Sequence, residues 1–339
     1  LPISYRKHLL PNYAVFDEQR YFEPFAADGP LVVVAGVRVG ITICEDAWSA
    51  TGPVLTQAAG GAELVVNLNA SPYHAGRVHE REAMLTTRGA DAGVPIVYAN
   101  LVGGQDELVF DGGSVVVDAT GSVRFRAPQF DEGLYVVEID VANGKVTLPK
   151  SAPAPEPPLV ERVYRALVLG TRDYVEKNGF AGAVLGLSGG VDSALTLTIA
   201  VDALGAARVH AVMMPSRYTS QMSLDDAAAE ARNLGVRYDT LSIEPMFDAT
   251  LGVLRGLFAG LPPDTTEENI QARCRGVLLM AISNKQGKML LTTGNKSEMA
   301  VGYATLYGDM AGGFAPLKDC TKVLVYQLAR YRNTLLLTS

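Results

Sequence analysis

Residues 188–193, Ser-Gly-Gly-Val-Asp-Ser, combine side chains and backbone that could bind phosphate. The apolar run 183–187 before them predicts a buried strand, and residues 191–204 predict an apolar helix. A helix N-terminus presents free N–H groups and the positive end of its dipole, and glycines let an anion approach closely. Asp192 would repel phosphate unless a cation lay between them. We therefore predict a phosphate-binding loop in which Asp192 binds a metal ion, most simply Mg²⁺.

The spacing of this loop separates it from two other nucleotide-binding loops. It lacks the lysine of a Walker loop and the glycine spacing of a Rossmann loop. It is similar to S-G-G-x-D-S, the PP-loop of ATP pyrophosphatases, which cleave ATP between the α and β phosphates. The alternative is an ordinary glycine-rich turn between a strand and a helix. The resemblance implies ATP contacts at Gly186, Leu187, Ser188, Gly189, Gly190, Val191, Asp192 and Ser193.

Cys44 ends a predicted strand and is followed at once by Glu45 and Asp46. A cysteine there is either a core residue or a nucleophile, and free cysteines are usually buried. A nucleophilic thiol, with an unperturbed pKa of about 8.5, needs a cation or base nearby to be mostly thiolate at neutral pH. Lys7 and the polar turn 69–77 are the neighbours that favour a nucleophile.

The amino-acid composition limits which classes of protein this chain can belong to. The 339 residues suggest two or more domains, and 48% hydrophobic residues can fill real cores. A net charge of −7 without long basic runs argues against nucleic acid as the main partner. No apolar run reaches the roughly 20 residues that span a membrane, so we expect no membrane partner. Three scattered cysteines indicate a reducing, cytoplasmic setting without a zinc site.

The elements that must position Cys44 are mostly strands. Apolar runs predict strands at 31–44 (two, turning near Gly36), 63–70, 95–102 and 133–141, with a helix at 79–93 and hairpins at 108–128. This first unit is therefore a strand-rich α/β layer. The proline-rich stretch 149–159 that follows predicts a stiff linker.

Strands and helices alternate after the linker. The predicted elements are helix 160–179, strand 183–187, helix 191–204, strand 208–215, helix 223–235, strand 237–243, a helix near 244–260, helix 268–286 and strand 288–293. This order favours a doubly wound parallel sheet of the α/β class. Ligands of such sheets bind at the carboxyl ends of the strands, where Gly189, Pro215, Ser242 and Gly294 lie.

Four motifs in the first unit resemble those of a known family. They are K-x-x-L-P-N-Y-x-V-F-D-E, I-C-E-D-x-W, N-A-S-P-x-x-x-G-R and V-G-G-Q-D-E-L-V-F-D-G. Together they resemble the nitrilase-like glutaminase domain of the glutamine-dependent NAD⁺ synthetase family, which implies an α-β-β-α layered fold. The resemblance implies Cys44 as nucleophile and Lys7 as oxyanion stabiliser, with glutamine bound by Tyr13, Glu45, Ser71 and Arg77. By residue type alone, Tyr13 could be a core aromatic and Arg77 a surface charge.

One departure from the family concerns the general base. The family's order is Glu, then Lys, then Cys, but only six residues precede Lys7 and none is acidic. Asp17, Glu18 and Glu23 do not fit this pattern, because they follow Lys7. We therefore expect the chain to be truncated at its N-terminus, and also at its C-terminus, where the family continues. If the chain were whole, its glutaminase should be nearly inactive.

The second unit resembles the synthetase domain of the same family, which has an adenine nucleotide alpha hydrolase-like fold. Residues 266–276 resemble the family's E-N-x-Q-A-R-x-R-G helix. The resemblance implies ATP contacts also at Thr293 and Lys322, a metal bound by Asp192 and Glu298, and deamido-NAD⁺ contacts at Asn269, Arg273, Glu298 and Tyr303. Asn269 and Arg273 share one helical face, which could instead be an ordinary polar face. Ser216 and Arg217 are weaker ATP candidates, Lys318 is an alternative to Lys322, and Cys274 and Cys320 are structural.

These resemblances imply ATP-dependent amidation of deamido-NAD⁺ to NAD⁺ through an acyl-adenylate, releasing AMP and pyrophosphate, with ammonia from glutamine hydrolysed at Cys44. We expect the glutaminase domain at 1–148, a linker at 149–158 and the synthetase domain at 159–339. We also expect a homo-oligomer with the synthetase site at a subunit interface. The alternatives are another PP-loop amidotransferase, and an ammonia-only synthetase with an inactive glutaminase domain.

Overall fold

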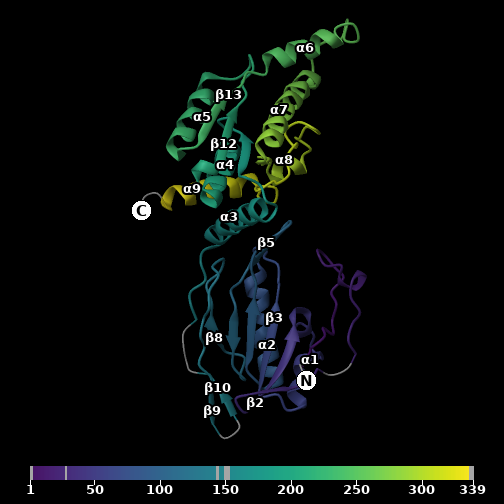
Figure 1. The fold of residues 1–339 in the computed structure, drawn as a ribbon, viewed down its shortest axis with the longest axis vertical. Coiled ribbons are helices and arrows are strands. Elements are labelled where there is room, and N and C mark those ends of the chain that lie inside the picture. The colour runs from purple at the N-terminus through teal and green to yellow at the C-terminus, as the bar shows by residue number, and fades with distance from the viewer. Residues whose placement is uncertain (1–2, 27–28, 143–144, 149–152, 336–339) are drawn as a thin grey trace. The chain divides into compact units, whose positions relative to one another are not determined.

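The computed structural model describes residues 3–26, 29–142, 145–148 and 153–335. It divides into two compact units. Unit 1 comprises Leu1–Gly103 and Leu108–Pro157, and unit 2 comprises Gly104–Glu107 and Pro158–Ser339. Figure 1 shows their helices and strands. Each unit has buried hydrophobic clusters of its own, so each has its own hydrophobic core.

Six strands form the main sheet of unit 1, in the order β1-β2-β3-β4-β7-β8. They are β1 (Val32–Val34), β2 (Val37–Ile43), β3 (Leu64–Asn69), β4 (Ile96–Asn100), β7 (Val115–Val117) and β8 (Val123–Arg126). Strands β2, β3 and β4 are parallel and the outer strands are antiparallel. Two smaller sheets pair β5 (Val102–Gln105) with β6 (Leu108–Asp111), and β9 (Asp140–Ala142) with β10 (Lys145–Thr147). The predicted turn near Gly36 and the strands at 63–70 and 95–102 are confirmed.

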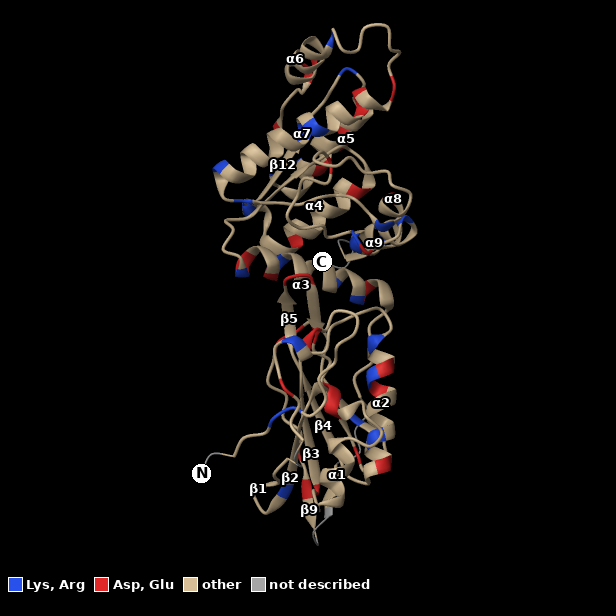
Figure 2. Cartoon of the chain, turned by 90° about the vertical axis from the view of Figure 1, so that its right-hand side faces the viewer, with Lys and Arg blue, Asp and Glu red and all other residues tan. Residues whose placement is uncertain are grey.

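Helices α1 (Pro53–Ala59) and α2 (Arg77–Ala92) pack on this sheet. Buried residues of the strands, such as Val65 and Ile96, share a cluster with Leu85 of α2, whereas the alternate residues Val66 and Val97 join a second cluster. The outer side of α2 carries charges of both signs (Figure 2). The described residues of unit 1 thus contain one helix layer and one large sheet of the expected layered fold.

The predicted strand at 133–141 is wrong over most of its length. Only its last two residues are in a strand, β9, which begins at Asp140. Leu134 is 94% exposed and Val136 is 82% exposed, so their side chains are not buried against a neighbouring layer. An apolar run favours burial, but strand formation also requires a partner strand, and residues 133–139 are not in any strand of the structure.

Unit 2 contains a parallel sheet of four strands in the order β13-β12-β11-β14. The strands are β11 (Ala183–Gly186), β12 (Val209–Met213), β13 (Arg237–Thr240) and β14 (Met289–Leu290). The helices are α3 (Leu159–Lys177), α4 (Val191–Leu204), α5 (Gln221–Leu234), α6 (Glu244–Leu254), α7 (Thr265–Gln286), α8 (Lys296–Ala300) and α9 (Lys322–Leu335). Short 3-10 helices lie at Glu18–Arg20 and Cys44–Ala47 in unit 1 and at Ala206–Arg208 in unit 2. The βα alternation is as predicted.

Alternate residues of the central strands fill two cores, which makes the sheet doubly wound. Ala183 and Leu185 join a cluster with α4 and α5, whereas Val184 joins one with α6 and α7. Strand β14 is shorter than predicted, because regular pairing stops at Leu290 and one bridge from Leu291 to Phe314 follows. Thr293 therefore lies in the loop after the strand and does not end it, contrary to the prediction.

Two further observations bear on the organisation of the chain. Of the predicted linker 149–158, residues 149–152 lie outside the described residues, and α3 begins at Leu159. Among the described residues, none of the helices combines the length and apolar character needed to cross a membrane.

Candidate active sites

Cys44 lies where β2 turns into a short 3-10 helix, at a backbone φ of +44°. A positive φ is uncommon for a non-glycine residue and costs conformational energy, so its neighbours must impose it. The side chain is 9% exposed. Burial raises the pKa of the Cys44 thiol, and the positive charges of Lys7 and Arg77 oppose that rise. The site therefore contains the cation that a thiolate requires.

Lys7 forms an ion pair that the sequence did not indicate. Its Nζ donates to Glu18 Oε1 at 2.7 Å and to Oε2 at 2.5 Å. The Glu18 carboxylate also raises the pKa of Cys44, so its charge acts on the thiol. By sequence order Glu18 had no place in the expected pattern, but the fold makes it the partner of Lys7.

Tyr13 and Glu45, two predicted glutamine contacts, are bonded to each other. The Tyr13 hydroxyl donates to the two Glu45 carboxylate oxygens at 3.0 and 3.1 Å. Tyr13 is 53% exposed, which excludes a core aromatic. Both residues line a hollow of about 880 Å³ together with Trp48. This hollow is large enough to admit a small polar molecule, although Cys44 itself is not among the residues that line it.

Arg77, at the start of α2, has partners for only part of its guanidinium. Its guanidinium lies 4.7 Å from the centre of the Trp48 ring, and Nη1 is 3.2 Å from Glu80 Oε2. Its Nε is buried without a hydrogen-bond partner among the described residues. A buried N–H of a guanidinium without a partner is unfavourable, and a carboxylate ligand would supply the missing acceptor.

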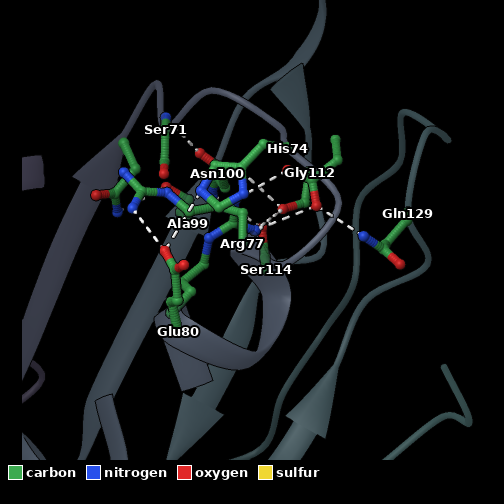
Figure 3. A network of polar contacts seen from close by, with 12 residues as sticks. Ser71, His74, Arg77, Glu80, Ala99, Asn100, Gly112, Ser114 and Gln129 are labelled. Atoms are coloured by element: carbon green, nitrogen blue, oxygen red, sulfur yellow. Dashed lines mark hydrogen bonds and ion pairs between the residues drawn. The ribbon is translucent and has the colours of Figure 1, made fainter. Parts of the chain in front are cut away.

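Ser71, 1% exposed, belongs to a polar network at the ends of β3 and β4. Its N–H donates to Asn100 Oδ1 at 2.9 Å, and the Asn100 N–H donates to Ser114 Oγ at 3.0 Å. Figure 3 shows this network with the Arg77–Glu80 pair beside it. Of the predicted glutamine contacts, Tyr13 and Glu45 are bonded to each other, and Arg77 packs on Trp48, which lines the same hollow.

The Ser188–Ser193 loop in unit 2 connects β11 to α4 and is cross-linked by its serines. Ser188 N–H donates to Ser193 Oγ at 3.2 Å, and Ser193 Oγ donates to Gly190 O at 2.9 Å. Gly189 has φ +81°, and a Cβ there would lie 2.4 Å from Ser223 O, so only glycine fits. Val191 opens the helix with its free N–H groups toward the loop.

Asp192, in the first turn of α4, is surrounded by polar partners from later in the chain. Lys322 Nζ forms an ion pair with its Oδ2, and Asn295 Nδ2 donates to its Oδ1 at 2.9 Å. Asn295 is fully buried, and its Oδ1 also accepts the N–H groups of Ser297 and Glu298 at 2.9 and 3.1 Å. Asn295 therefore links two predicted metal ligands, Asp192 and Glu298. The N-x-x-E capping pattern in 295–298 is the signal that could have identified it.

A cavity of about 600 Å³ opens at the carboxyl ends of β11, β12 and β14. Six predicted contacts line it: Gly186, Leu187, Ser188, Asn269, Thr293 and Tyr303. Gly189, Gly190, Val191, Asp192, Ser193, Arg273, Glu298 and Lys322 are not among its lining residues. Arg275, which is not among the predicted contacts, also lines the cavity, and its Nε donates to Met214 O at 3.1 Å.

The segment after α8 is bonded to α7 across this cavity. Thr305 Oγ1 donates to Asn269 Oδ1 at 2.8 Å, and the Tyr303 hydroxyl donates to Glu268 Oε1 at 3.1 Å. Arg273 Nε donates to Leu306 O at 3.3 Å. Three of the four predicted deamido-NAD⁺ contacts, Asn269, Arg273 and Tyr303, thus connect these two elements, whereas Glu298 bonds to Asn295.

Other predicted residues lie apart from the loop. Arg217 pairs with Glu244 and Asp248 of α6, which accounts for its charge without a ligand. Cys274 and Cys320 are buried free thiols, in agreement with a structural role. Among the described residues no group of three or more His, Cys, Asp or Glu side chains could hold a metal ion.

Comparison with known proteins matches both units. Residues 163–335 match the family model described as NAD synthase, and residues 1–147 match that described as carbon-nitrogen hydrolase. A glutamine-dependent NAD(+) synthetase from Xylella fastidiosa is 53% identical over 332 residues, which cover 98% of this chain and 61% of that protein. One from Thermotoga maritima is 47% identical over 361 residues, covering 97% of this chain and 62% of that protein.

Among solved structures, the glutamine-dependent NAD⁺ synthetase from Acinetobacter baumannii, in complex with ADP, has a TM-score of 0.91 at 49% identity. The match covers 98% of this chain and 62% of that one. A synthetase of the same description from Cytophaga hutchinsonii, at 23% identity and a TM-score of 0.78, shows the same fold. The chain spans about three fifths of the length of these relatives.

Proposed function

The chain belongs to the NAD synthase family and, because a carbon-nitrogen hydrolase domain precedes that part, we propose that it is a glutamine-hydrolysing NAD⁺ synthase. The observation that carries the proposal is the Ser188–Ser193 loop, with Asp192 at the N-terminus of α4, at the edge of the 600 Å³ cavity. This arrangement suits a nucleoside triphosphate, because the loop presents N–H groups to phosphate and the cavity can enclose a base.

The proposed synthetase reaction takes place in unit 2. The nicotinate carboxylate of deamido-NAD⁺ attacks the α-phosphate of ATP, so that pyrophosphate leaves and an acyl-adenylate forms. Ammonia then attacks the acyl carbon, and AMP leaves. Loop N–H groups and the Lys322 ammonium would bind the phosphates, while Asn269 and Arg273 on α7, with Tyr303 and Glu298, would orient the dinucleotide.

A magnesium ion is part of this proposal. Asp192 already accepts a cationic partner in the Lys322 ammonium, and Glu298 is held near it through Asn295. Magnesium typically uses only one or two carboxylates together with substrate phosphates, so these two side chains fit it. When bound, it would offset the charge of the leaving pyrophosphate.

The proposed glutaminase reaction takes place in unit 1. The Cys44 thiolate attacks the side-chain carbonyl of glutamine, the amide nitrogen takes up a proton from water and leaves as ammonia, and water hydrolyses the thioester to glutamate. The Lys7 ammonium would stabilise the oxyanion, and Tyr13, Glu45, Ser71 and Arg77 would bind the substrate. The proposed domains are 1–148 and 159–339, joined by 149–158.

We also propose a cytoplasmic homo-oligomer with the synthetase site at a subunit interface. The three free cysteines suit a reducing compartment. Sedimentation combined with activity measured across a dilution series tests the assembly. Full activity in a protein shown to be monomeric would overturn this part.

The experiment that tests the reaction supplies ATP, Mg²⁺ and deamido-NAD⁺ with either glutamine or an ammonium salt. We expect NAD⁺, AMP and pyrophosphate in equal amounts with both nitrogen donors. Formation of ADP would overturn the pyrophosphatase step. NAD⁺ formation with ammonium alone would instead identify a synthetase whose glutaminase domain is inactive.

A further inference from the structure

Asp46 is a fully buried carboxylate two residues after Cys44. A charged group without water is stable only where hydrogen-bond donors surround it. Its partners in the described chain are three backbone N–H groups and one phenol. Four donors bound to one carboxylate indicate that Asp46 holds in place the segments from which the donors come.

The two oxygens of Asp46 join the segment around Lys7 to the turn around Cys44. Oδ1 accepts the N–H groups of His8 and Leu9, the two residues after Lys7, at 3.1 and 2.9 Å. Oδ2 accepts the Tyr5 hydroxyl at 2.7 Å. Bonds on both sides of Lys7 therefore fix the backbone from which its ammonium extends.

The same carboxylate also fixes the backbone in front of the proposed nucleophile. Oδ2 accepts the N–H of Ile43 at 3.0 Å, which closes the turn that places Cys44 at φ +44°. The strained residue and the lysine segment thus have one common anchor. Because its four donors come from residues 5–9 and from residue 43, a rotation of this one side chain would release both segments.

We propose that Asp46 is a positioning residue of the glutaminase site, which holds the Lys7 ammonium in place beside the Cys44 thiol. This inference rests on the proposed function of Cys44. Among the charged groups that act on the thiol, Lys7 and Arg77 lower its pKa, and Glu45 and Glu18 raise it. The buried Arg81 also interacts with the thiol, but it is paired with Asp111 and lies outside the segments that Asp46 anchors. If Lys7 moved away, its positive charge would no longer offset the negative charges of Glu45 and Glu18, and the pKa of the thiol would rise.

The test is the pH dependence of Cys44 alkylation by iodoacetamide, followed at the Cys44 peptide by mass spectrometry in the full chain. In Asp46→Asn the NH₂ group faces two donors whichever way the amide turns, so either the bonds from the His8 and Leu9 N–H groups or the bond from the Ile43 N–H is lost. In both cases the common anchor of the two segments is broken. We expect the midpoint of alkylation to rise by about one pH unit, a tenfold loss of thiolate at neutral pH. Lys7→Met should raise it similarly.

The double variant distinguishes positioning from general stabilisation. If Asp46 acts through Lys7, Asp46→Asn in the Lys7→Met background shifts the midpoint no further. A full additional shift would overturn the proposal, as would an unchanged midpoint in Asp46→Asn alone. The matched control is Asp118→Asn, because Asp118 also accepts backbone N–H groups, of Thr120 and Ser122, in a hairpin of the same unit. It should leave the midpoint unchanged.

A measurement on the unaltered protein keeps the proposal testable if Asp46→Asn does not fold. The amides of His8 and Leu9 should exchange with deuterium far more slowly than those of exposed loops, because Asp46 accepts both. Exchange within seconds would overturn the proposal. None of these readouts requires glutamine hydrolysis. An inactive glutaminase with the expected alkylation pattern would contradict the proposed function and leave the role of Asp46 intact.

Discussion

At Cys44, burial and neighbouring charges act in opposite directions on the thiol. Burial and the carboxylates of Glu45 and Glu18 raise its pKa, and the cations of Lys7 and Arg77 lower it. The reactivity of this residue is therefore set by side chains from three separate stretches of the chain.

Replacing Glu18 by glutamine tests this balance. Removing a negative charge that raises the pKa of Cys44 lowers that pKa, so more thiolate is present at a given pH below the midpoint. We expect the alkylation midpoint of Cys44 to move to lower pH, measured with iodoacetamide between pH 6 and 10. Glu23→Gln, at an exposed position of the same segment, is the control and should leave the midpoint in place. A shift to higher pH in Glu18→Gln would contradict the assigned charges.

Replacing Cys44 by alanine separates the two nitrogen donors. Glutamine-supported NAD⁺ formation should fall to background, because no thioester can form, whereas ammonium-supported formation should continue at the unaltered rate. Cys274→Ala, in the core of unit 2, is the control and should cost only about 1 kcal/mol of stability. Loss of the ammonium-supported reaction in Cys44→Ala would show that the cysteine has another role.

At the scale of elements, the connection from β11 to α4 depends on a glycine at a close approach. Gly189→Ala would place a Cβ 2.4 Å from Ser223 O and should weaken ATP binding at least tenfold by displacing the loop. Gly205→Ala is a matched control, because Gly205 has φ +80° but no atom within 4 Å of the place a Cβ would occupy. Both variants should lose stability, of order 1–3 kcal/mol from the backbone alone. Calorimetric titration with ATP and Mg²⁺ checks this, and equal loss of affinity in both would contradict it.

The N-terminus of α8 is connected to α4 through Asn295, over 103 positions of sequence. Asn295→Asp retains a good capping residue but places a second carboxylate against Asp192. We expect ATP affinity to fall and to depend more strongly on Mg²⁺ concentration, because a cation must now offset two charges. Asn295→Ser, which keeps the cap without a donor amide, should lose less affinity. The comparison is made by titration at several Mg²⁺ concentrations, and equal behaviour of the two variants would refute a link to Asp192.

At the scale of the whole molecule, two units with separate buried clusters should respond separately to ligands. Scanning calorimetry should resolve two transitions, and ATP with Mg²⁺ should raise only one of them. At a hundred times the dissociation constant the stabilisation should be about 2.7 kcal/mol. Gly189→Ala should abolish this increase. A single transition that rises as a whole would show that the units unfold together.

Most elements of this fold could be predicted from local patterns. Strand β11, the glycines and helix α4 follow one another in sequence, so the phosphate-binding loop needs no distant information. The strand expected at 133–141 failed because an apolar run does not by itself provide a partner strand. The length of β14 failed for the same reason, since its pairing partners are elsewhere in the chain.

By itself, the sequence determined which residue types could do chemistry: a cysteine at a strand end, a lysine near it, and a serine–glycine loop before a helix. These are local features, because short-range spacing decides secondary structure and capping. Only the tertiary structure decided the partners. The bonds from Asp46 to His8 and from Asn295 to Asp192 cross 38 and 103 positions. Hydrogen bonds and ion pairs require proximity in space, and only the packing of distant elements supplies it.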